Sequence, residues 1–310
     1  MSPTRPVVAS LTLAHGRHHH LRPQLVGLLD GTRVPDLVVV AAMDDPGIPE
    51  VVESVVHPVE AHGAAPVDAA RRPGVQTFPV PRDEGHLPLA RARNEAAERA
   101  IAAGAELLVF LDVDCLPSPP LVQRYAAAWA EVGRNSSAPV VLSGAVHYLP
   151  SRRPGQDRYD AADLAASLPH PARPVAPEAR CEPMDDLLLF WSLSFAMSAT
   201  HWQRVGGFDE GYRGYGGEDT DFALRVQQAG GRGYWVGGAA AYHQHHAVDD
   251  PPRQHVADIV RNGNRFHERW GFFPMSGWLD TFEAEGLVTR SGRPPRLHLS
   301  SSGGSAARSG

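Results

Sequence analysis

The stretch from Glu106 to Asp114 has the sequence Glu-Leu-Leu-Val-Phe-Leu-Asp-Val-Asp, a short apolar run that ends in two aspartates. Such a bounded run is typical of a buried parallel strand. Ligands of open α/β sheets bind at the carboxyl ends of the strands. Paired carboxylates there, Asp112 and Asp114, suit a Mg²⁺ or Mn²⁺ ion that carries the phosphates of a substrate. The pair would also fit a polar strand end with a helix-capping aspartate, because Pro117 and Pro119 indicate that a helix starts nearby.

Strand-like and helix-like patterns alternate on either side of this run. Strands are predicted over residues 7–14, 36–43, 75–80 and 140–149, and helices over residues 18–30, 88–103 and 117–132. Pro23 lies inside the first turns of the first helix, which predicts that this helix starts late. The alternation predicts an α/β fold with a mostly parallel central sheet flanked by helices.

The chain length of 310 residues fits one large α/β domain. We expect this domain to span residues 1–299, followed by a disordered tail at 300–310 that is rich in serine and glycine. Seven prolines interrupt residues 150–183. This Pro-rich segment is expected to be either a lid over a functional site or a mobile insertion.

The composition excludes several classes of function. The net charge is −6, and the chain contains no lysine, so all 29 basic residues are arginines. Without an overall basic charge, nucleic acid is not an expected partner. Without lysine, a Walker A phosphate loop and Schiff-base catalysis are excluded.

The two cysteines, Cys115 and Cys181, form no disulfide framework, which favours a reducing environment. Cys115 is expected to be a small buried residue rather than a nucleophile. No stretch approaches the roughly 20 apolar residues of a membrane-spanning helix, and the N-terminus has no apolar signal region. We expect a cytoplasmic protein, with peripheral contact to a membrane left open.

A second acidic cluster lies in the stretch Gly214-Tyr215-Gly216-Gly217-Glu218-Asp219-Thr220-Asp221. Glycine adopts backbone conformations closed to other residues, so Gly217 allows a ligand to approach closely. The acidic residues fall in the first turn of a predicted helix, where the helix dipole favours them. This structural explanation suffices for any one of them but not for the whole set with its glycines and aromatic residues, so we predict a functional site here too.

Three motifs together carry a family resemblance: Phe-Leu-Asp-Val-Asp at 110–114, Gly-Gly-Phe-Asp-Glu at 206–210 and Gly-Tyr-Gly-Gly-Glu-Asp-Thr-Asp at 214–221. With them the chain resembles GT-A glycosyltransferases, especially family 2 enzymes with a β-galactosyltransferase-like C-terminal segment. The resemblance covers roughly residues 7–270, without the Pro-rich segment and the tail. It implies the GT-A fold of nucleotide-diphospho-sugar transferases and a metal-dependent, inverting hexosyltransferase. The implied donor is a nucleotide sugar, with UDP favoured over GDP, and the acceptor is unknown.

The resemblance also implies roles for the acidic residues. Asp114 would bind the Mn²⁺ or Mg²⁺ ion that bridges the donor diphosphate, and Asp112 would face the ribose or a metal-bound water. Asp219 would be the catalytic base, with Glu218 in contact with the acceptor. These roles suit an inverting transfer, which needs a carboxylate to deprotonate the acceptor and a Lewis acid for the leaving group.

A third metal ligand is implied at a histidine after the last core strand, which we predict at residues 234–236. His243 is the preferred residue and His245 the next, with His246 also close by. The earlier run of histidines at 18–20 is predicted to lie on a solvated helix face.

The remaining predicted residues belong to the substrate side. The donor is expected to contact His15, Arg17 and Asp44 at the ends of the first two strands, and Arg93 and Asn94 on the helix before the metal strand. A surface position is the alternative for Arg93. Trp191 is expected either to stack on a sugar or to belong to the core.

Three other classes of protein share some of these features. A haloacid dehalogenase-like Mg²⁺-dependent phosphatase would use Asp112 as its nucleophile, but its aspartate pair normally lies near the N-terminus. A dinucleotide-dependent oxidoreductase would need a Gly-x-Gly-x-x-Gly after the first strand, where His15-Gly16-Arg17 stands instead. A non-catalytic carbohydrate-binding relative would lack the base or the metal ligands, and both acidic motifs are intact here.

Overall fold

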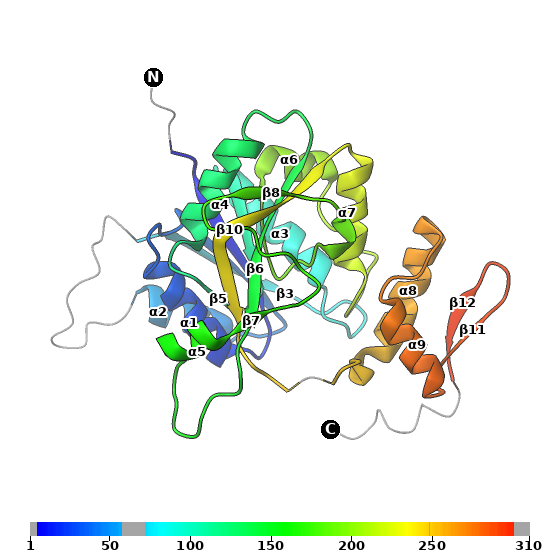
Figure 1. The fold of residues 1–310 in the computed structure, drawn as a ribbon. Coiled ribbons are helices and arrows are strands. Elements are labelled where there is room, and N and C mark those ends of the chain that lie inside the picture. Colours follow the sequence, from blue (N-terminus) through cyan, green and yellow to red (C-terminus); the bar gives the residue numbers. More distant parts are fainter. Residues whose placement is uncertain (1–4, 58–71, 248, 301–310) are drawn as a thin grey trace.

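The computed structural model describes residues 5–57, 72–247 and 249–300 (Figure 1). Within these ranges ten strands form one sheet in the order β3-β2-β1-β4-β9-β6-β10-β5, with β7 beside β6 and β8 beside β10. They are β1 (Val8–Ala14), β2 (Leu37–Met43), β3 (Gly74–Val80), β4 (Leu107–Leu111), β5 (Cys115–Pro117), β6 (Val140–Tyr148), β7 (Leu168–Pro169), β8 (Cys181–Met184), β9 (Ser194–Ser198) and β10 (Arg232–His243).

The sheet combines two parallel groups. Strands β3, β2, β1 and β4 are parallel to one another, and β6 is parallel to β10. Strand β9 is antiparallel to both of its neighbours, β4 and β6, and joins the two groups. The predicted α/β architecture is confirmed, whereas the strand pattern did not predict the antiparallel β9.

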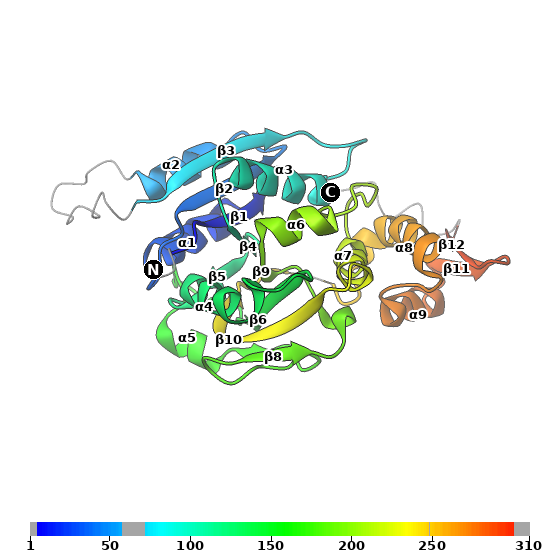
Figure 2. The same ribbon diagram turned by 90° about the horizontal axis from the view of Figure 1, so that it is seen from above.

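Helices cover both faces of the sheet (Figure 2). On β4 the side chains of Leu107, Val109 and Leu111 join one apolar cluster, and those of Leu108 and Phe110 join the other. This alternation is the two-residue period of a strand that is buried on both faces. The first cluster includes α1 (His18–Leu29), α2 (Ile48–Val56) and α4 (Leu121–Ala128), and the second includes α3 (Leu89–Ala102), α6 (Ala199–Val205) and α7 (Glu218–Gln228).

Two expectations for α1 are wrong. The helix begins at His18 rather than after Pro23, although proline removes one helical hydrogen bond. His20 is buried instead of solvated, and Leu21 beside it packs into the core. Burial of this first turn against the sheet outweighs the local penalty of the proline. His18 and His19 are exposed, as predicted.

Strand β10 is longer than the three residues predicted at 234–236. It continues past an irregularity between Val236 and Ala241 and ends only at His243. Gly237 and Gly238 interrupt the apolar pattern, so the sequence did not predict that the strand continues after them. The predicted helix at 117–132 starts late, at Leu121, and ends in a π-helical turn (Trp129–Gly133).

The Pro-rich segment at 150–183 is structured. It contains α5 (Ala161–Ala166), whose capping box joins Asp160 and Asp163, and Arg153 pairs with both of these aspartates. Strand β7 then pairs with β6, and β8 pairs with β10, so the segment adds two short strands to the sheet.

The chain ends in a smaller unit, which we call the C-terminal lobe (residues 253–299, Figure 1). It consists of a 3₁₀ turn (Arg253–His255), α8 (Val256–Trp270), α9 (Ser276–Ala284) and the hairpin β11 (Val288–Ser291) and β12 (Arg296–Leu299). The lobe has its own apolar cluster, formed by Ile259, Val260, Leu279, Phe282, Val288 and Leu297. Of the predicted tail, Ser300 bonds to the Leu287 carbonyl, and residues 301–310 lie outside the described residues. No helix in the described ranges is long and apolar enough to cross a membrane.

Candidate active site

Asp114 is the centre of a cluster of three candidate metal ligands just beyond β4. Its Oδ1 lies 3.6 Å from Nε2 of His243, and its Oδ2 lies 3.3 Å from Nε2 of His246. The three ligand atoms all lie within 4.8 Å of one another. Strand β5 follows Asp114 directly and pairs with the end of β10, where Cys115 stands opposite His243. The sheet itself therefore holds the aspartate and the first histidine together.

The protonation states suit a divalent ion. Burial raises the pKa of Asp114, but the hydrogen bond from His246 and the charges of His243 and Arg17 outweigh burial and lower it overall. Burial lowers the pKa of His243, although Asp114 opposes this. An ionised carboxylate beside imidazole nitrogens is a donor set for Mn²⁺ or a similar ion, with phosphate oxygens completing the shell.

The predicted ligand His243 is in this cluster, whereas no sequence pattern favoured His246. His245 instead lies beside Ser151, with its ring nitrogens 3.1 and 3.2 Å from the serine hydroxyl. Three closely spaced histidines after a strand indicate a site, but the turn after β10 decides which of them faces Asp114.

Asp112 lies outside the cluster and contacts Arg93 instead. Its Oδ1 is 3.4 Å from Nη2 of Arg93. Burial raises the pKa of Asp112 to about 6, against the lowering effect of Arg93. Its role as a metal ligand stays a prediction.

Arg93 joins the two acidic motifs. Its Nη1 lies 3.4 Å from Oε1 of Glu218, and its guanidinium lies 5.0 Å from the centre of the Phe208 ring. The side chain is buried, so the surface alternative for Arg93 is wrong. Helix α3 turns this arginine inward because the neighbouring buried positions are alanines, which leave room for it.

Glu218 and Asp219 form an acidic pair at the start of α7, in which Glu218 is buried and Asp219 is half-buried. Burial raises the pKa of Glu218 to about 7, with a further increase from the Asp219 charge and a decrease from Arg93. Burial also raises the pKa of Asp219, against the hydrogen bond that Thr220 donates from its backbone. Oε2 of Glu218 is buried and has no hydrogen-bond partner among the described residues. Carboxyl groups with raised pKa values are suited to accept a proton near neutral pH.

The glycines before this pair have a defined conformational role. Gly216 and Gly217 have φ angles of 97° and 90°, in the left-handed region that other residues rarely adopt. Gly217 caps α7, so the tight turn places both acids in the first helical turn. Asp221 has a structural role instead, because it is fully buried and accepts hydrogen bonds from Arg225 and from the Trp270 indole at 2.9 Å each.

His15 and Asp44 come together at the ends of β1 and β2, through a residue that the sequence did not single out. Arg82 places Nε 2.6 Å from Asp44 and Nη2 3.1 Å from the His15 ring. Arg17 points elsewhere, with Nη1 3.3 Å from Asp114. Asp45, also missed, accepts hydrogen bonds from the backbone of the β1–α1 turn and from His18.

Asn94 and Trp191 lie apart from these groups. The Asn94 amide donates to the Phe208 carbonyl at 2.9 Å and accepts from the Phe208 amide at 2.8 Å, so it braces the 206–210 loop. Trp191 is half-buried, with the Arg173 guanidinium 5.2 Å from the ring and the His170 ring 4.7 Å away. The stacking of Trp191 on a sugar stays a prediction.

The expectation for Cys115 is confirmed. The thiol is fully buried, and burial raises its pKa well above the ordinary value. A thiol that stays protonated in this way is not a nucleophile.

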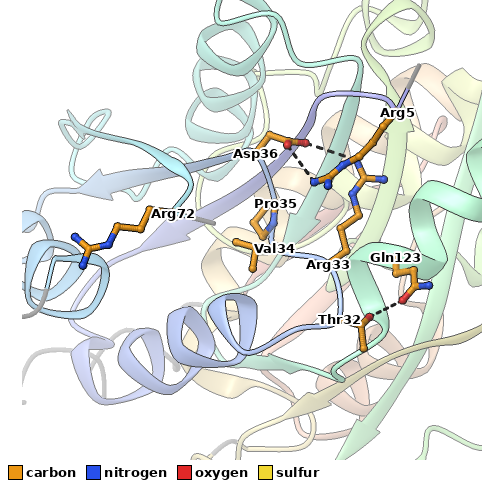
Figure 3. A pocket seen from close by; sticks show the side chains of 8 residues that line it. All are labelled: Arg5, Thr32, Arg33, Val34, Pro35, Asp36, Arg72 and Gln123. Atoms are coloured by element: carbon orange, nitrogen blue, oxygen red, sulfur yellow. Dashed lines mark hydrogen bonds and ion pairs between the residues drawn. The ribbon is translucent and has the colours of Figure 1, made fainter. Parts of the chain in front are cut away.

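A hollow of about 440 Å³ lies at the other end of the sheet (Figure 3). Asp36 pairs there with Arg5 at 3.2 Å and with Arg33 at 3.5 Å. These residues precede β1 and β2, so the hollow is at the amino ends of the strands. Because ligands of open α/β sheets bind at the carboxyl ends, we assign the candidate active site to the acidic clusters instead.

The comparisons with known proteins concern both the sequence and the fold. Residues 180–247 match a family model described as the N-terminal domain of galactosyltransferase. Two validoxylamine A glucosyltransferases of Streptomyces hygroscopicus, from subspecies jinggangensis (strain 5008) and subspecies limoneus, are each 32% identical over 157 residues, 46% of this chain. The chain spans only about a third of these curated relatives, 36% and 33% of their lengths.

Two solved structures share the fold. The crystal structure of GalNAc-T7 with UDP, GalNAc and Mn²⁺ has a TM-score of 0.53 and 13% identity, covering 91% of this chain and 57% of that one. S. aureus TarS 1–349 in complex with UDP-GlcNAc has a TM-score of 0.54 and 13% identity, covering 84% of this chain and 63% of that one. The matched family segment contains Glu218, Asp219 and both histidines of the metal cluster. The chain therefore has the GT-A fold, and its predicted resemblance to the GT-A glycosyltransferases, with a galactosyltransferase-like segment, is confirmed.

Proposed function

We propose that this chain is a metal-dependent, inverting glycosyltransferase that moves a sugar from a nucleotide-diphosphate sugar to an acceptor hydroxyl. One observation carries the proposal: the ligand cluster around Asp114 and the acidic pair Glu218–Asp219 lie at the same end of the sheet, with Arg93 in contact with both acidic motifs. UDP is the favoured nucleotide, in keeping with the UDP and UDP-GlcNAc in the two solved structures of the same fold.

Asp114, His243 and His246 would hold the divalent ion. When bound, such an ion supplies positive charge to the diphosphate that leaves the sugar. Arg17 adds a second positive charge on this side of the site, because its guanidinium lies 3.3 Å from Asp114. The phosphates of the donor therefore meet cationic groups on the side of Asp114.

The acidic pair would serve the acceptor. Asp219 accepts the proton of the acceptor hydroxyl, and the acceptor oxygen attacks the sugar carbon on the face opposite the leaving diphosphate. The raised pKa of Asp219 makes its carboxylate a stronger base than an exposed aspartate. Glu218 is oriented by Arg93, and its buried Oε2, which has no hydrogen-bond partner in the part of the chain that the structure describes, would pair with a hydroxyl of the acceptor.

The phosphatase alternative loses support. It would need the Asp112 carboxylate as a nucleophile, but that carboxylate is paired with Arg93. The molecules bound in the two solved structures of the same fold also favour a transferase, since one structure contains UDP with GalNAc and the other UDP-GlcNAc.

Thermal melting with UDP, GDP and dTDP, each with and without Mn²⁺, tests the donor side. A ligand that binds only the folded state raises the melting temperature. We expect UDP with Mn²⁺ to raise it in the wild type and not in Asp114→Ala. No shift with any of the nucleotides would contradict the proposal.

Release of UDP from a UDP-sugar then separates an enzyme from a non-catalytic relative. Because the curated relatives are named validoxylamine A glucosyltransferases, UDP-glucose is the first donor to test and validoxylamine A the first acceptor. Binding of UDP without turnover of UDP-glucose, UDP-galactose or UDP-GlcNAc would favour the non-catalytic relative.

A further inference from the structure

The loop that delivers Glu218 and Asp219 has little stiffness of its own. Gly214, Gly216 and Gly217 all have positive φ angles, of 66°, 97° and 90°. Glycines at such angles leave the chain free to adopt many other conformations. Contacts from outside the loop must therefore determine where the two carboxylates lie.

Arg213 and Gly214 also contact the segment after β3, through Asp83 and the Leu87 carbonyl, but several of these contacts come from α8 in the C-terminal lobe. Oδ2 of Asp258 accepts a hydrogen bond from the Tyr215 amide at 3.2 Å. One turn later, the fully buried Asn262 accepts from the Arg213 amide at 3.3 Å and donates to the Arg213 and Tyr215 carbonyls at 3.0 and 3.2 Å. Two side chains of one helix thus bind the backbone on both sides of Gly214.

Asp258 occupies the space that a side chain at position 214 would need. A Cβ atom built on Gly214 would lie 2.1 Å from Oδ2 of Asp258. The carboxylate is held in turn by Arg261 at 2.6 Å and by Nδ1 of His86 at 3.2 Å. Since His86 belongs to the loop after β3, Asp258 joins three separate segments of the chain.

We propose that Asp258, together with Asn262, is a positioning residue for the acidic pair. It acts through the backbone of residues 213–217, because its carboxylate accepts a hydrogen bond from the Tyr215 amide. This inference rests on the proposed function of Glu218 and Asp219, and it makes the C-terminal lobe part of the catalytic machinery. Asp258 and Asn262 lie outside the segment at 180–247 that matches the galactosyltransferase family model, so that match does not cover them.

Kinetics of Asp258→Ala and Asp258→Asn test the inference. The alanine variant is expected to lower kcat by up to about 100-fold, because a misplacement of about 1 Å can cost that much. KM for the donor and the binding of UDP with Mn²⁺ stay unchanged, because Asp114, His243 and His246 lie on other elements. Asp258→Asn keeps an acceptor for the Tyr215 amide and is expected to restore most of kcat.

Two further variants complete the set. Gly214→Ala, whose Cβ would displace the carboxylate, is expected to lower kcat in the same way. Asp280→Ala is the matched control, because Asp280 lies on α9 of the same lobe, is exposed, and pairs with the Arg290 side chain at 3.2 Å. Full kcat in Asp258→Ala, or equal losses in the alanine and asparagine variants, would overturn the inference.

Hydrogen exchange supplies a readout that does not depend on activity. In Asp258→Ala the amides of residues 213–219 are expected to exchange faster than in the wild type, because their opening is no longer opposed. Unchanged exchange there would overturn the inference even if no substrate were found. If Asp258→Ala exchanges faster but the wild type shows no turnover, the proposed function is rejected and the contact between α8 and the loop is still established.

Discussion

Arg93 and Glu218 are 125 residues apart in the chain and lie in contact inside the protein, with 3.4 Å between Nη1 and Oε1. Both residues are buried, at 4% and 7% exposure. The same guanidinium also contacts Asp112, so a single cation serves carboxylates of both acidic motifs. Loss of this cation would leave buried negative charges without compensation.

Arg93→Ala is therefore expected to destabilise the protein by about 3–5 kcal/mol, the usual cost of removing one partner of a buried ion pair. Arg91→Ala is the control on the same helix. Its ion pair with Glu95 is 3.6 Å long and partly exposed, so its loss is expected to cost less than about 1 kcal/mol. Urea unfolding of both variants measures the difference, and similar losses would show that the Arg93 contacts are not special.

Glu218→Gln is expected to stabilise the protein at pH 8. Burial raises the pKa of Glu218 from its usual 4.5 to about 7. Between these two values the unfolded chain releases a proton that the folded chain retains, so stability falls as the pH rises through this window. Glutamine keeps an acceptor for Arg93 without this penalty.

Melting temperatures at pH 5, 6, 7 and 8 follow this effect. The advantage of Glu218→Gln over the wild type should grow with pH and be absent near pH 4.5. Glu268→Gln serves as the control, because Glu268 is 60% exposed in its pair with Arg296. A constant difference across the series would contradict the raised pKa.

Asp219→Asn is expected to abolish sugar transfer while UDP still binds in the presence of Mn²⁺. Asparagine retains an oxygen for the Thr220 amide, which lies 2.7 Å from Asp219, but it cannot accept the proton of the acceptor. Transfer assays and nucleotide-dependent melting are measured on the same preparation. Wild-type turnover in this variant would refute the assignment of the base.

His246→Ala is expected to weaken Mn²⁺ binding at least tenfold, since losing even an outer partner of a metal ligand typically costs about 10- to 100-fold. His245→Ala should leave the affinity unchanged, because its ring lies beside Ser151 instead. Titration calorimetry with Mn²⁺ in the presence of UDP compares the two. Equal losses, or a loss only in His245→Ala, would contradict the ligand cluster.

Sequence patterns predicted the parts of this protein that are local. The run before Asp112 is a buried strand because its apolar residues are consecutive, and the acids at 218 and 219 start a helix because a glycine turn precedes them. The contacts of Arg93, Arg82 and Asp258 join segments that are far apart in the chain, so no local sequence pattern could predict them.

His20 is buried because its helix packs against the sheet. His246 rather than His245 faces Asp114 because of the turn that follows β10. The C-terminal lobe was not predicted, because its role depends on a contact with a distant segment. Its helices carry ordinary amphipathic patterns, and only the folded chain shows that α8 binds the glycine loop.

The pairing of Cys115 with His243 limits how the length of this chain can vary. Neighbouring residues of a strand point to opposite faces, so inserting or deleting one residue between Ala241 and His243 would turn the imidazole away from Asp114. The irregular stretch between Val236 and Ala241 is not constrained in this way, because its residues do not pair with β6. Relatives that keep the metal cluster are therefore expected to differ in length within that stretch and to be uniform after it.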